Sequence, residues 1–300
     1  MQQTSNDVWT FCHYCTHGSS RLVSDCGRAY TALQRMLAKI RHILGRSPAM
    51  PTPSVPTGER VYAIGDIHGR IDLFEDLIRM IEEDDAGRRR AHTTIVLLGD
   101  LIDRGHDSAA VVARAREWSK TREIEFLQGN HEEMLLLSRT KTESLRGFLK
   151  FGGRETIQSY GVDAETIMAA SIEELQALMN EAIPQDDFDF LDSFKKMVRI
   201  GDYLFVHAGI RPSTPIEHQL GQDCRWIREP FLSHKGSFGA CVIHGHTITE
   251  EPEVCANRIG IDTGAFVHGT LTAIGLEGTE RWFLQARDHE VPAEETTAVA

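Results

Sequence analysis

Four short apolar segments in this chain are each followed, within three residues, by an aspartate, asparagine or histidine. The segments are Val61–Ile64, Thr94–Leu98, Ile124–Leu127 and Tyr203–Val206. Apolar runs of this length, bounded by glycine or polar residues, predict buried strands. After the first run, Asp66 and His68 stand two residues apart between Gly65 and Gly69, so they can project to the same side of the strand end. The sequence therefore predicts sheets whose strand ends carry polar side chains.

The segments between the first three apolar runs have the spacing of amphipathic helices. A helix near 71–83 would place Phe74, Leu77 and Ile81 on one face, a second would begin at the capping residues Asp107-Ser108, and a third would begin near His131. Strands and helices that alternate in this order predict a parallel sheet with helical crossovers. Sites in such sheets form at the carboxyl ends of the strands.

Residues 140–200 break this alternation with consecutive helical patterns, including a capping box at Ser171 and Glu174. We expect a helical insertion there, and an insertion beside the active edge often shapes the substrate mouth. Strand patterns resume at 203–207, 241–245, 258–262, 270–275 and 281–285, without helices between them. These strands are expected to form a mostly antiparallel second sheet packed on the first.

Residues 1–58 are expected to form a disordered arm that carries a basic amphipathic helix and a proline-rich linker. The apolar residues from Arg28 to Leu44 recur at a helical period, and the opposite face is basic. That helix suits packing on its own domain, with an anionic membrane surface or a partner as alternatives. The linker is marked by Pro48, Pro51, Pro53 and Pro56. The working domain is therefore expected to span residues 59–290.

Within the arm, Cys12-His13-Tyr14-Cys15 has part of a zinc-knuckle pattern but lacks the second paired half. An unstructured tail is the simpler interpretation. Translation starting at Met36 is an alternative that would remove most of the arm.

The formal net charge of −12 argues against a nucleic-acid binder held by phosphate contacts. Residues 1–60 carry seven basic and three acidic side chains, a net charge of +4, so the remainder carries −16. An acidic body that handles an anionic substrate needs local positive charge, which bound metal ions would supply. No apolar run approaches the roughly 20 residues of a membrane helix, and the first twenty residues lack the apolar core of a secretory signal. A cytoplasmic location is the expectation.

The polar residues at the strand ends form a set of six candidate metal ligands. They are Asp66, His68, Asp100, Asn130, His207 and His246. Carboxylates, a carboxamide and imidazoles in this mixture suit divalent ions such as Mn, Fe or Zn. Two ions that share Asp100 and a hydroxide would use all six, whereas one tetrahedral site with an open position would not. Singly, Asp66, Asp100 and Asn130 also fit ordinary turn residues after strands.

Five motifs resemble those of the metallophosphoesterase superfamily in their order and approximate spacing. They are Gly65-Asp66-Ile67-His68-Gly69, Gly99-Asp100-Leu101-Ile102-Asp103-Arg104-Gly105, Gly129-Asn130-His131-Glu132, Val206-His207-Ala208-Gly209 and His244-Gly245-His246-Thr247. The Asp103-Arg104-Gly105 form is similar to the Ser/Thr phosphoprotein phosphatase branch, especially its bacterial and phage members. The resemblance covers residues from about 60 to about 285. It implies an α/β fold, a calcineurin-like four-layer α-β-β-α sandwich with two mixed sheets and a helical insertion.

The resemblance also implies roles for individual residues. Asp66, His68 and His246 correspond to ligands of the first metal and the shared site, Asp100 to the bridge, and Asn130 and His207 to ligands of the second metal. His244, two residues before His246, is left out of the ligand set. His131 corresponds to the general acid and Asp103 to the carboxylate that orients it. Arg104 corresponds to a phosphate clamp, and a second clamp is expected at Arg228 in Trp226-Ile227-Arg228-Glu229, with Arg211 as the competitor.

The activity implied is a dinuclear metal-dependent phosphomonoesterase, most simply a serine/threonine protein phosphatase that uses two manganese ions, with Fe or Zn as alternatives. Its substrate would be a phosphorylated protein or a small phosphoester. A symmetrical bis(5'-nucleosyl)-tetraphosphatase is the alternative, although such relatives tend to lack the acid at the position of Asp103. A scaffold protein with a vestigial site is a third hypothesis.

Overall fold

The computed structural model describes residues 52–288. The half zinc knuckle and the basic helix expected in the arm therefore lie outside the described residues. Residues 53–58, expected as linker, belong to the folded body. The Val55 N–H donates to the Gly278 carbonyl at 2.8 Å, and the Val55 side chain is buried among apolar residues of both sheets. The body thus begins near Pro53 rather than at Glu59.

The first sheet has five strands, and its centre confirms the predicted alternation of strands and helices. β1 (Glu59–Ile64), β2 (His92–Leu97) and β3 (Glu123–Phe126) pair in parallel, and α2 (Ile71–Gly87) and α3 (Ser108–Trp118) connect them. β9 (Thr270–Glu277) pairs with β1 antiparallel, and β10 (Glu280–Arg287) completes the order β10-β9-β1-β2-β3. The last two strands were expected in the second sheet, so that expectation is wrong.

The second sheet is mixed rather than mostly antiparallel. Its order is β4 (Met197–Ile200), β5 (Tyr203–Val206), β6 (Cys241–His244), β8 (Arg258–Gly260) and β7 (Glu253–Val254). The central strands β5, β6 and β8 are parallel, and the two outer pairs are antiparallel. The connection from β5 to β6 contains η1 (Ile216–His218) and α10 (Gly221–Trp226) and is long enough for the crossover that a parallel pair requires.

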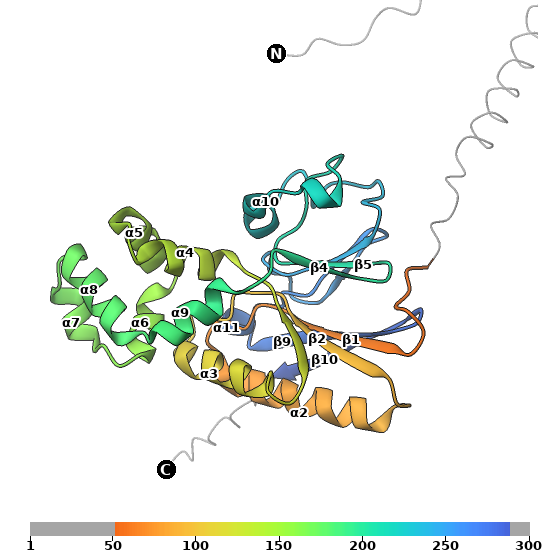
Figure 1. Cartoon of the computed structure of the whole chain (residues 1–300), viewed down its shortest axis with the longest axis horizontal. Helices are drawn as coiled ribbons and strands as arrows, with labels where there is room; N and C mark the ends of the chain where they lie inside the picture. The colour runs from red at the N-terminus through yellow and green to blue at the C-terminus, as the bar shows by residue number, and fades with distance from the viewer. Residues whose placement is uncertain (1–51, 289–300) are drawn as a thin grey trace, which may run out of the picture. The chain divides into compact units, whose positions relative to one another are not determined.

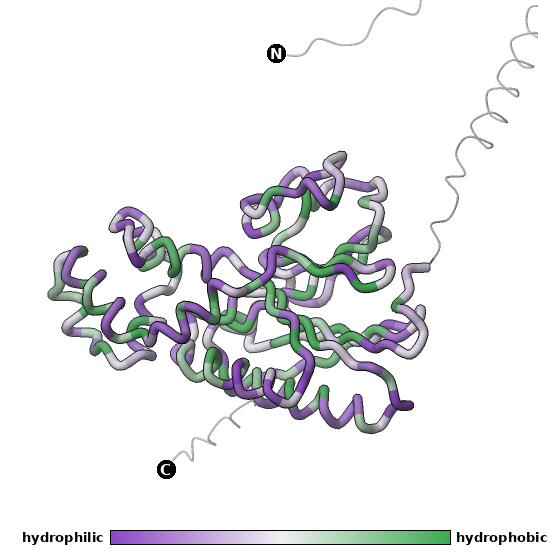
Figure 2. The backbone as a smooth tube through the Cα atoms, viewed as in Figure 1, coloured by the Kyte–Doolittle hydropathy of each residue, from purple (hydrophilic) through white to green (hydrophobic). Residues whose placement is uncertain are grey.

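Alternating side chains build the layers of the sandwich. In β1, Tyr62 and Ile64 pack in the core that α2 and α3 cover, whereas Val61 and Ala63 pack against residues of the second sheet. In β5, Leu204 and Val206 form a third cluster with α10 and the segment after it. Hydrophobic strand segments accordingly lie inside the layers, with hydrophilic helix segments outside (Figures 1 and 2). This is the four-layer α-β-β-α arrangement expected from the resemblance.

A run of short helices follows β3, seen at one end of the body in Figure 1; the first is the helix predicted near His131, and the others form the insertion. The helices are α4 (Asn130–Ser138), α5 (Thr142–Lys150), α6 (Gly153–Ser159), α7 (Ala164–Ala169), α8 (Ile172–Ala182) and α9 (Gln185–Asp192). The capping box at Ser171 and Glu174 is formed at the start of α8, as predicted. β4 lies inside the range 140–200 that was expected to be helical, so the helical part ends at Asp192.

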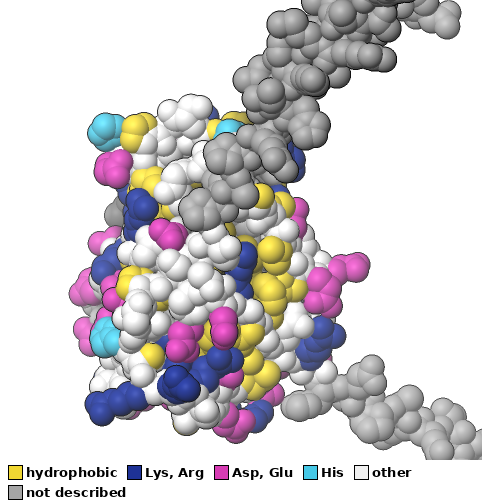
Figure 3. Space-filling model, turned by 90° about the vertical axis from the view of Figure 1, so that its right-hand side faces the viewer, with side chains coloured by type: hydrophobic (Ala, Val, Ile, Leu, Met, Phe, Trp, Pro, Cys, Tyr) yellow, Lys and Arg dark blue, Asp and Glu magenta, His cyan; other side chains and the backbone are white. Residues whose placement is uncertain are grey.

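The opposite end of the body, where the parallel strands begin, faces the viewer in Figure 3. Acidic, basic and apolar side chains are interspersed there, and the apolar ones form a narrow strip. Between residues 52 and 288, no helix combines the length and the apolar character that crossing a membrane requires. The cytoplasmic location expected from the sequence stays a prediction.

Candidate active site

The loop after β1 carries the first two predicted ligands, both buried. His68 has a left-handed backbone, with φ of 48°, and its Nδ1–H donates to the Ile102 carbonyl at 2.9 Å. The proton on Nδ1 leaves Nε2 with its lone pair, and Nε2 lies 3.7 Å from Asp100 Oδ2. The backbone thus selects the tautomer of His68 that can bind a cation through Nε2.

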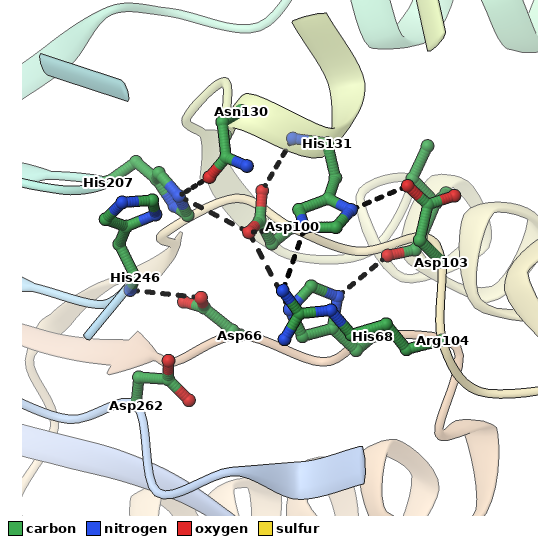
Figure 4. Close-up of polar contacts among 12 residues, drawn as sticks. Asp66, His68, Asp100, Asp103, Arg104, Asn130, His131, His207, His246 and Asp262 are labelled. Atoms are coloured by element: carbon green, nitrogen blue, oxygen red, sulfur yellow. Dashed lines mark hydrogen bonds and ion pairs between the residues drawn. The ribbon is translucent and has the colours of Figure 1, made fainter. Parts of the chain in front are cut away.

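Asp100, after β2, lies at the centre of the site (Figure 4). Its Oδ1 accepts the backbone N–H of His131 at 3.0 Å, which fixes the carboxylate. Its Oδ2 lies 3.4 Å from His207 Nε2 and 3.8 Å from His131 Nε2, as well as 3.7 Å from His68 Nε2. One carboxylate oxygen therefore faces imidazole nitrogens from three different elements, which is the position a bridging ligand needs.

Asn130 and His207 meet on one side of Asp100. His207 Nδ1–H donates to the Leu98 carbonyl at 2.9 Å, while its Nε2 lies 3.0 Å from Asn130 Oδ1. Burial lowers the pKa of His207 to about 4, so Nε2 carries no proton at neutral pH. In this tautomer the Nε2 lone pair faces the Asn130 amide oxygen at hydrogen-bond distance. A cation bound by both atoms would stabilise that contact.

His246 and Asp66 meet on the other side. The backbone N–H of His246 donates to Asp66 Oδ2 at 3.0 Å. Among the described residues, neither Asp66 Oδ1 nor His246 Nε2 has a hydrogen-bond partner, although both are buried. Buried polar atoms are rarely left unpaired, because each costs about 1–3 kcal/mol. These two atoms are available to a ligand that is not part of the chain.

The electrostatics of the cluster favour bound cations. Burial raises the pKa of Asp66 well above its usual value, and the neighbouring Asp262 and Asp100 carboxylates add to the rise. Burial raises the pKa of Asp100 to about 6 and lowers that of His246 to about 2. Crowded carboxylates and neutral imidazoles within one buried site suit divalent ions. Asp100, His207 and His246 can direct one atom each to within 4.8 Å of one another, and so can His68, Asp100 and His131. The described residues therefore fit bound divalent metal ions, and one of these groups contains His131, which was predicted as the general acid and not as a ligand.

His131 and Asp103 form a second buried unit beside the ligand cluster. His131 Nδ1 lies 2.6 Å from Asp103 Oδ2, and its Nε2 lies 3.3 Å from Arg104 Nη2. The Asp103 carboxylate also accepts a hydrogen bond from the Thr156 hydroxyl of α6, and its backbone N–H donates to the Thr156 and Ser108 hydroxyl oxygens at 2.9 and 3.0 Å. Asp103 thereby orients His131 and is itself held by the insertion and by α3.

The two predicted clamps are placed differently. Arg104 extends over the Phe266 ring at 4.4 Å, and its guanidinium group lies among His131, His68 and Asp100 in Figure 4. Arg228 is exposed, and its Nη2 reaches the His246 carbonyl at 3.4 Å. The competitor Arg211 is instead bound by Asp223, with contacts of 2.5 and 3.0 Å. Arg228 is therefore the better candidate of the two.

His244 was left out of the ligand set, and the structure places it apart. Its Nδ1 contacts the Gly245 carbonyl at 3.0 Å, and its Nε2 lies 3.3 Å from Arg258 Nη1. The ring packs edge-on against Phe231 on the outer side of the second sheet. This histidine is a satisfied core residue.

Backbone strain concentrates at the site. Within residues 52–288, six residues other than glycine have positive φ: His68, Asp100, Asp103, Arg104, Ser213 and His246. Five of these are predicted site residues, and such strain persists where the surrounding structure holds a residue in place for function. Gly129 is required sterically, since a Cβ there would lie 2.1 Å from Asp100 Oδ1.

Four residues near the site were not assigned by sequence reasoning. The buried Glu132 carboxylate accepts the backbone N–H groups of Asp100, Leu101 and Gly129 at 2.7–2.9 Å and so supports the bridge. The others are Asp262, Thr156 and Phe266. Glu132 belongs to the motif Gly129-Asn130-His131-Glu132, so the sequence offered a signal that could have identified it. The other three come from distant segments. Thr156 ends the run Phe151-Gly152-Gly153-Arg154-Glu155-Thr156, which resembles a segment of bacterial members of the superfamily, but that resemblance gave Thr156 no role.

The comparisons with known proteins agree with this geometry. The family model for calcineurin-like phosphoesterases matches residues 59–269, more than half of the chain. The serine/threonine-protein phosphatase 1 of Salmonella typhimurium is 27% identical over 224 residues, which cover 72% of this chain and 92% of that protein. The asymmetrical bis(5'-nucleosyl)-tetraphosphatase PrpE of Oceanobacillus iheyensis is 24% identical over 237 residues, covering 71% and 87%.

A symmetrical bis(5'-nucleosyl)-tetraphosphatase of Nitrosospira multiformis is 24% identical over 269 residues, which cover 72% of this chain and 92% of that one. Among solved structures, one provisionally described as a diadenosine tetraphosphatase aligns with a TM-score of 0.55 at 21% identity, covering 79% of this chain and all of that one. At that identity the structural likeness concerns the fold. By its family match, its two mixed sheets and its site motifs, this chain belongs to the calcineurin-like phosphoesterase family and is a hydrolase that acts on phosphoesters.

Proposed function

We propose that this enzyme is a serine/threonine protein phosphatase that uses two divalent metal ions, manganese by preference. The ligands would be Asp66, His68, Asp100, Asn130, His207 and His246. When bound, such ions would lower the pKa of a water molecule and neutralise negative charge on the phosphoryl group. The remaining steps depend on side chains of the chain itself.

The observation that carries the proposal is the buried Asp103–His131 pair, joined at 2.6 Å. Phosphoserine and phosphothreonine release a strongly basic alkoxide, which needs a proton in the transition state. A phosphoanhydride releases a nucleotide oxyanion that is stable without one. An oriented imidazole with a carboxylate on its far nitrogen is therefore more useful for an alkyl phosphomonoester than for a dinucleoside polyphosphate.

Arg104 and His131 would both act on the transferred group. The Arg104 guanidinium suits two phosphoryl oxygens, and its move to the substrate would release His131 Nε2, which it contacts in the free enzyme at 3.3 Å. Burial lowers the pKa of His131 in the free enzyme. An incoming phosphoryl group adds negative charge beside Nε2 and favours the protonated ring, which then donates its proton to the leaving oxygen.

The second candidate is a bis(5'-nucleosyl)-tetraphosphatase, because relatives with that name match the chain about as well as the phosphatase does. A panel assay with the manganese-loaded full chain separates the two. We expect a higher kcat/KM for phosphoserine and phosphothreonine peptides than for diadenosine tetraphosphate. The reverse order would replace the proposal with the second candidate.

Two variants test whether the site is catalytic at all. Asp66→Asn and His131→Ala should each abolish turnover of phosphopeptides, whereas a vestigial scaffold would show no turnover before or after the change. Circular dichroism and thermal unfolding of each variant establish that the fold is kept. Wild-type turnover that survives Asp66→Asn would remove Asp66 from the proposed ligand set.

A further inference from the structure

A groove of about 640 Å³ lies on the helical insertion, and none of the predicted site residues lines it. Its polar lining is basic throughout: Arg146 and Lys150 stand one turn apart on α5, and Arg154 is on α6. Its apolar lining includes the buried side chains of Ile167 and Leu175. No acidic residue is among the residues that line it.

The three basic side chains of this groove are unpaired. Each is exposed, and none makes an ion pair or a side-chain hydrogen bond with any residue between 52 and 288. Both basic residues of the neighbouring helix α3 are matched, Arg116 with Asp187 at 2.6 Å and Arg114 with Glu75 at 2.8 Å. In a chain with a net charge of −12, three unpaired cations around one concavity mark a site for an anionic ligand.

The shape and polarity of the groove select among anions. Its apolar floor accepts a hydrophobic side chain, and Met168 on the rim is 73% exposed. The volume is within the range of about 300–1,000 Å³ typical of ligand sites. An acidic peptide with one large apolar residue supplies both the anchor for the floor and the carboxylates for the rim. A free inorganic anion leaves the floor unused.

The short helix α6 separates the groove from the predicted active site. Arg154 lines the groove, whereas Thr156, two residues later, contacts Asp103. Each residue of a helix is rotated by about 100° from the one before it, so two residues give a rotation of about 200°. The two side chains therefore leave nearly opposite faces of α6. A helix is about 10 Å thick, so an extended chain of about five residues covers the distance around it.

We propose that this groove docks an acidic segment of a phosphoprotein substrate, with an apolar side chain on the floor and carboxylates at Arg146, Lys150 and Arg154. The segment would stand at least about five residues from the phosphoserine or phosphothreonine. The proposal rests on the proposed phosphatase function for its substrate, but the binding itself does not require turnover.

Binding is measured first, by fluorescence anisotropy of a labelled, unphosphorylated acidic peptide that contains one leucine, added to the full chain. The triple variant Arg146→Glu, Lys150→Glu and Arg154→Glu should bind it at least about 30-fold more weakly, since three attractive contacts become repulsive. The same peptide with glutamine in place of glutamate should bind the wild type weakly. Equal binding by wild type and triple variant would overturn the proposal.

The matched control reverses the charge of three exposed basic residues outside the groove, in the variant Arg90→Glu, Lys235→Glu and Arg281→Glu. It changes the net charge by the same amount and should leave peptide affinity within about twofold of wild type, because these residues lie outside the helical insertion and do not line the groove. The triple variant Arg146→Glu, Lys150→Glu and Arg154→Glu is the groove variant. A loss of peptide affinity in the control as large as that in the groove variant would show that overall charge sets the affinity, and it would overturn the proposal.

Kinetics then separate this proposal from the proposed function. The groove variant should raise KM for a phosphopeptide with the acidic segment and leave kcat/KM for p-nitrophenyl phosphate unchanged. Groove-dependent peptide binding without phosphopeptide hydrolysis would support docking and refute only the phosphatase function. Phosphopeptide hydrolysis with the same KM in the groove variant would refute docking alone.

Two alternative occupants of the groove, a nucleotide and the chain's own end, predict different results in the binding assay. Competition of the labelled peptide by AMP at concentrations similar to those of unlabelled peptide would assign the groove to nucleotides and overturn the proposal. Residues 289–300 carry Glu290, Glu294 and Glu295. Peptide affinity that rises at least about tenfold when these residues are removed would make the chain's own end the occupant and also overturn it.

Discussion

Replacing Asp103 with asparagine tests whether the Asp103–His131 pair protonates the leaving oxygen. The two side chains meet at 2.6 Å and are 0% and 1% exposed. Asparagine keeps the size of the side chain but removes its charge, so the hydrogen bond that holds the protonated ring weakens by about 1.5–3 kcal/mol. Because about 1.4 kcal/mol corresponds to a factor of ten, kcat on phosphoserine peptides should fall about 10- to 150-fold.

The loss from Asp103→Asn should depend on the leaving group. A serine alkoxide needs a proton in the transition state, whereas p-nitrophenolate is stable enough to leave without one. We expect kcat on p-nitrophenyl phosphate to stay within about threefold of wild type. The assay measures kcat on both substrates at saturating manganese. Equal losses on the two substrates would refute the proton-donor role of His131.

The fold of the Asp103→Asn variant should be intact. Burial raises the pKa of Asp103 well above its usual range, which means that the buried charge is itself unfavourable. A neutral side chain of the same shape removes that penalty, so Tm should not fall. Asp192→Asn makes the same chemical change at an exposed position and should leave both kcat values and Tm unaltered.

Three further predictions concern two residues that support the site and the binding of manganese. Thr156→Val removes the hydroxyl that holds Asp103 and should lower kcat on phosphoserine peptides about tenfold, more than on p-nitrophenyl phosphate, with Thr156→Ser restoring it. Glu132→Gln places an amide N–H against backbone donors beside Asp100 and should weaken manganese affinity about 10- to 100-fold in a calorimetric titration; unchanged affinity would dismiss that role. Manganese at a hundred times its Kd should stabilise the wild type by about 2.7 kcal/mol, seen as a higher Tm that a chelator reverses. In the Asp100→Asn variant, manganese should raise Tm much less than in the wild type.

Local signals were sufficient for the strands and for the candidate ligands. The four apolar runs correspond to β1, β2, β3 and β5. Burial on both faces explains the continuous apolar residues of β5, whereas β3 is a partly exposed edge strand that alternates acidic and apolar residues. The six ligand candidates follow strand ends or occupy their loops, and the structure brings all six into one cluster. Each candidate ligand lies within a few residues of its strand end, so a short stretch of local sequence is enough to place it there.

Pairing between distant strands had no comparable signal. β9 and β10 form an antiparallel hairpin, and nothing in their residues states whether they join the first sheet or the second. The choice depends on long-range contacts, in which β9 pairs with β1 across more than two hundred residues of chain. The same applies to β4, a four-residue strand that local periodicity assigned to the helical insertion.

The sequence alone predicted the chemistry proposed for this enzyme, namely the set of candidate ligands, the imidazole with its carboxylate and the divalent metals, because those residues belong to short motifs. Only the tertiary structure decided what holds and surrounds that chemistry. Thr156 reaches Asp103 from 53 positions away, and three cations from α5 and α6 gather on one groove. Such contacts arise from packing, which no segment of a chain specifies by itself.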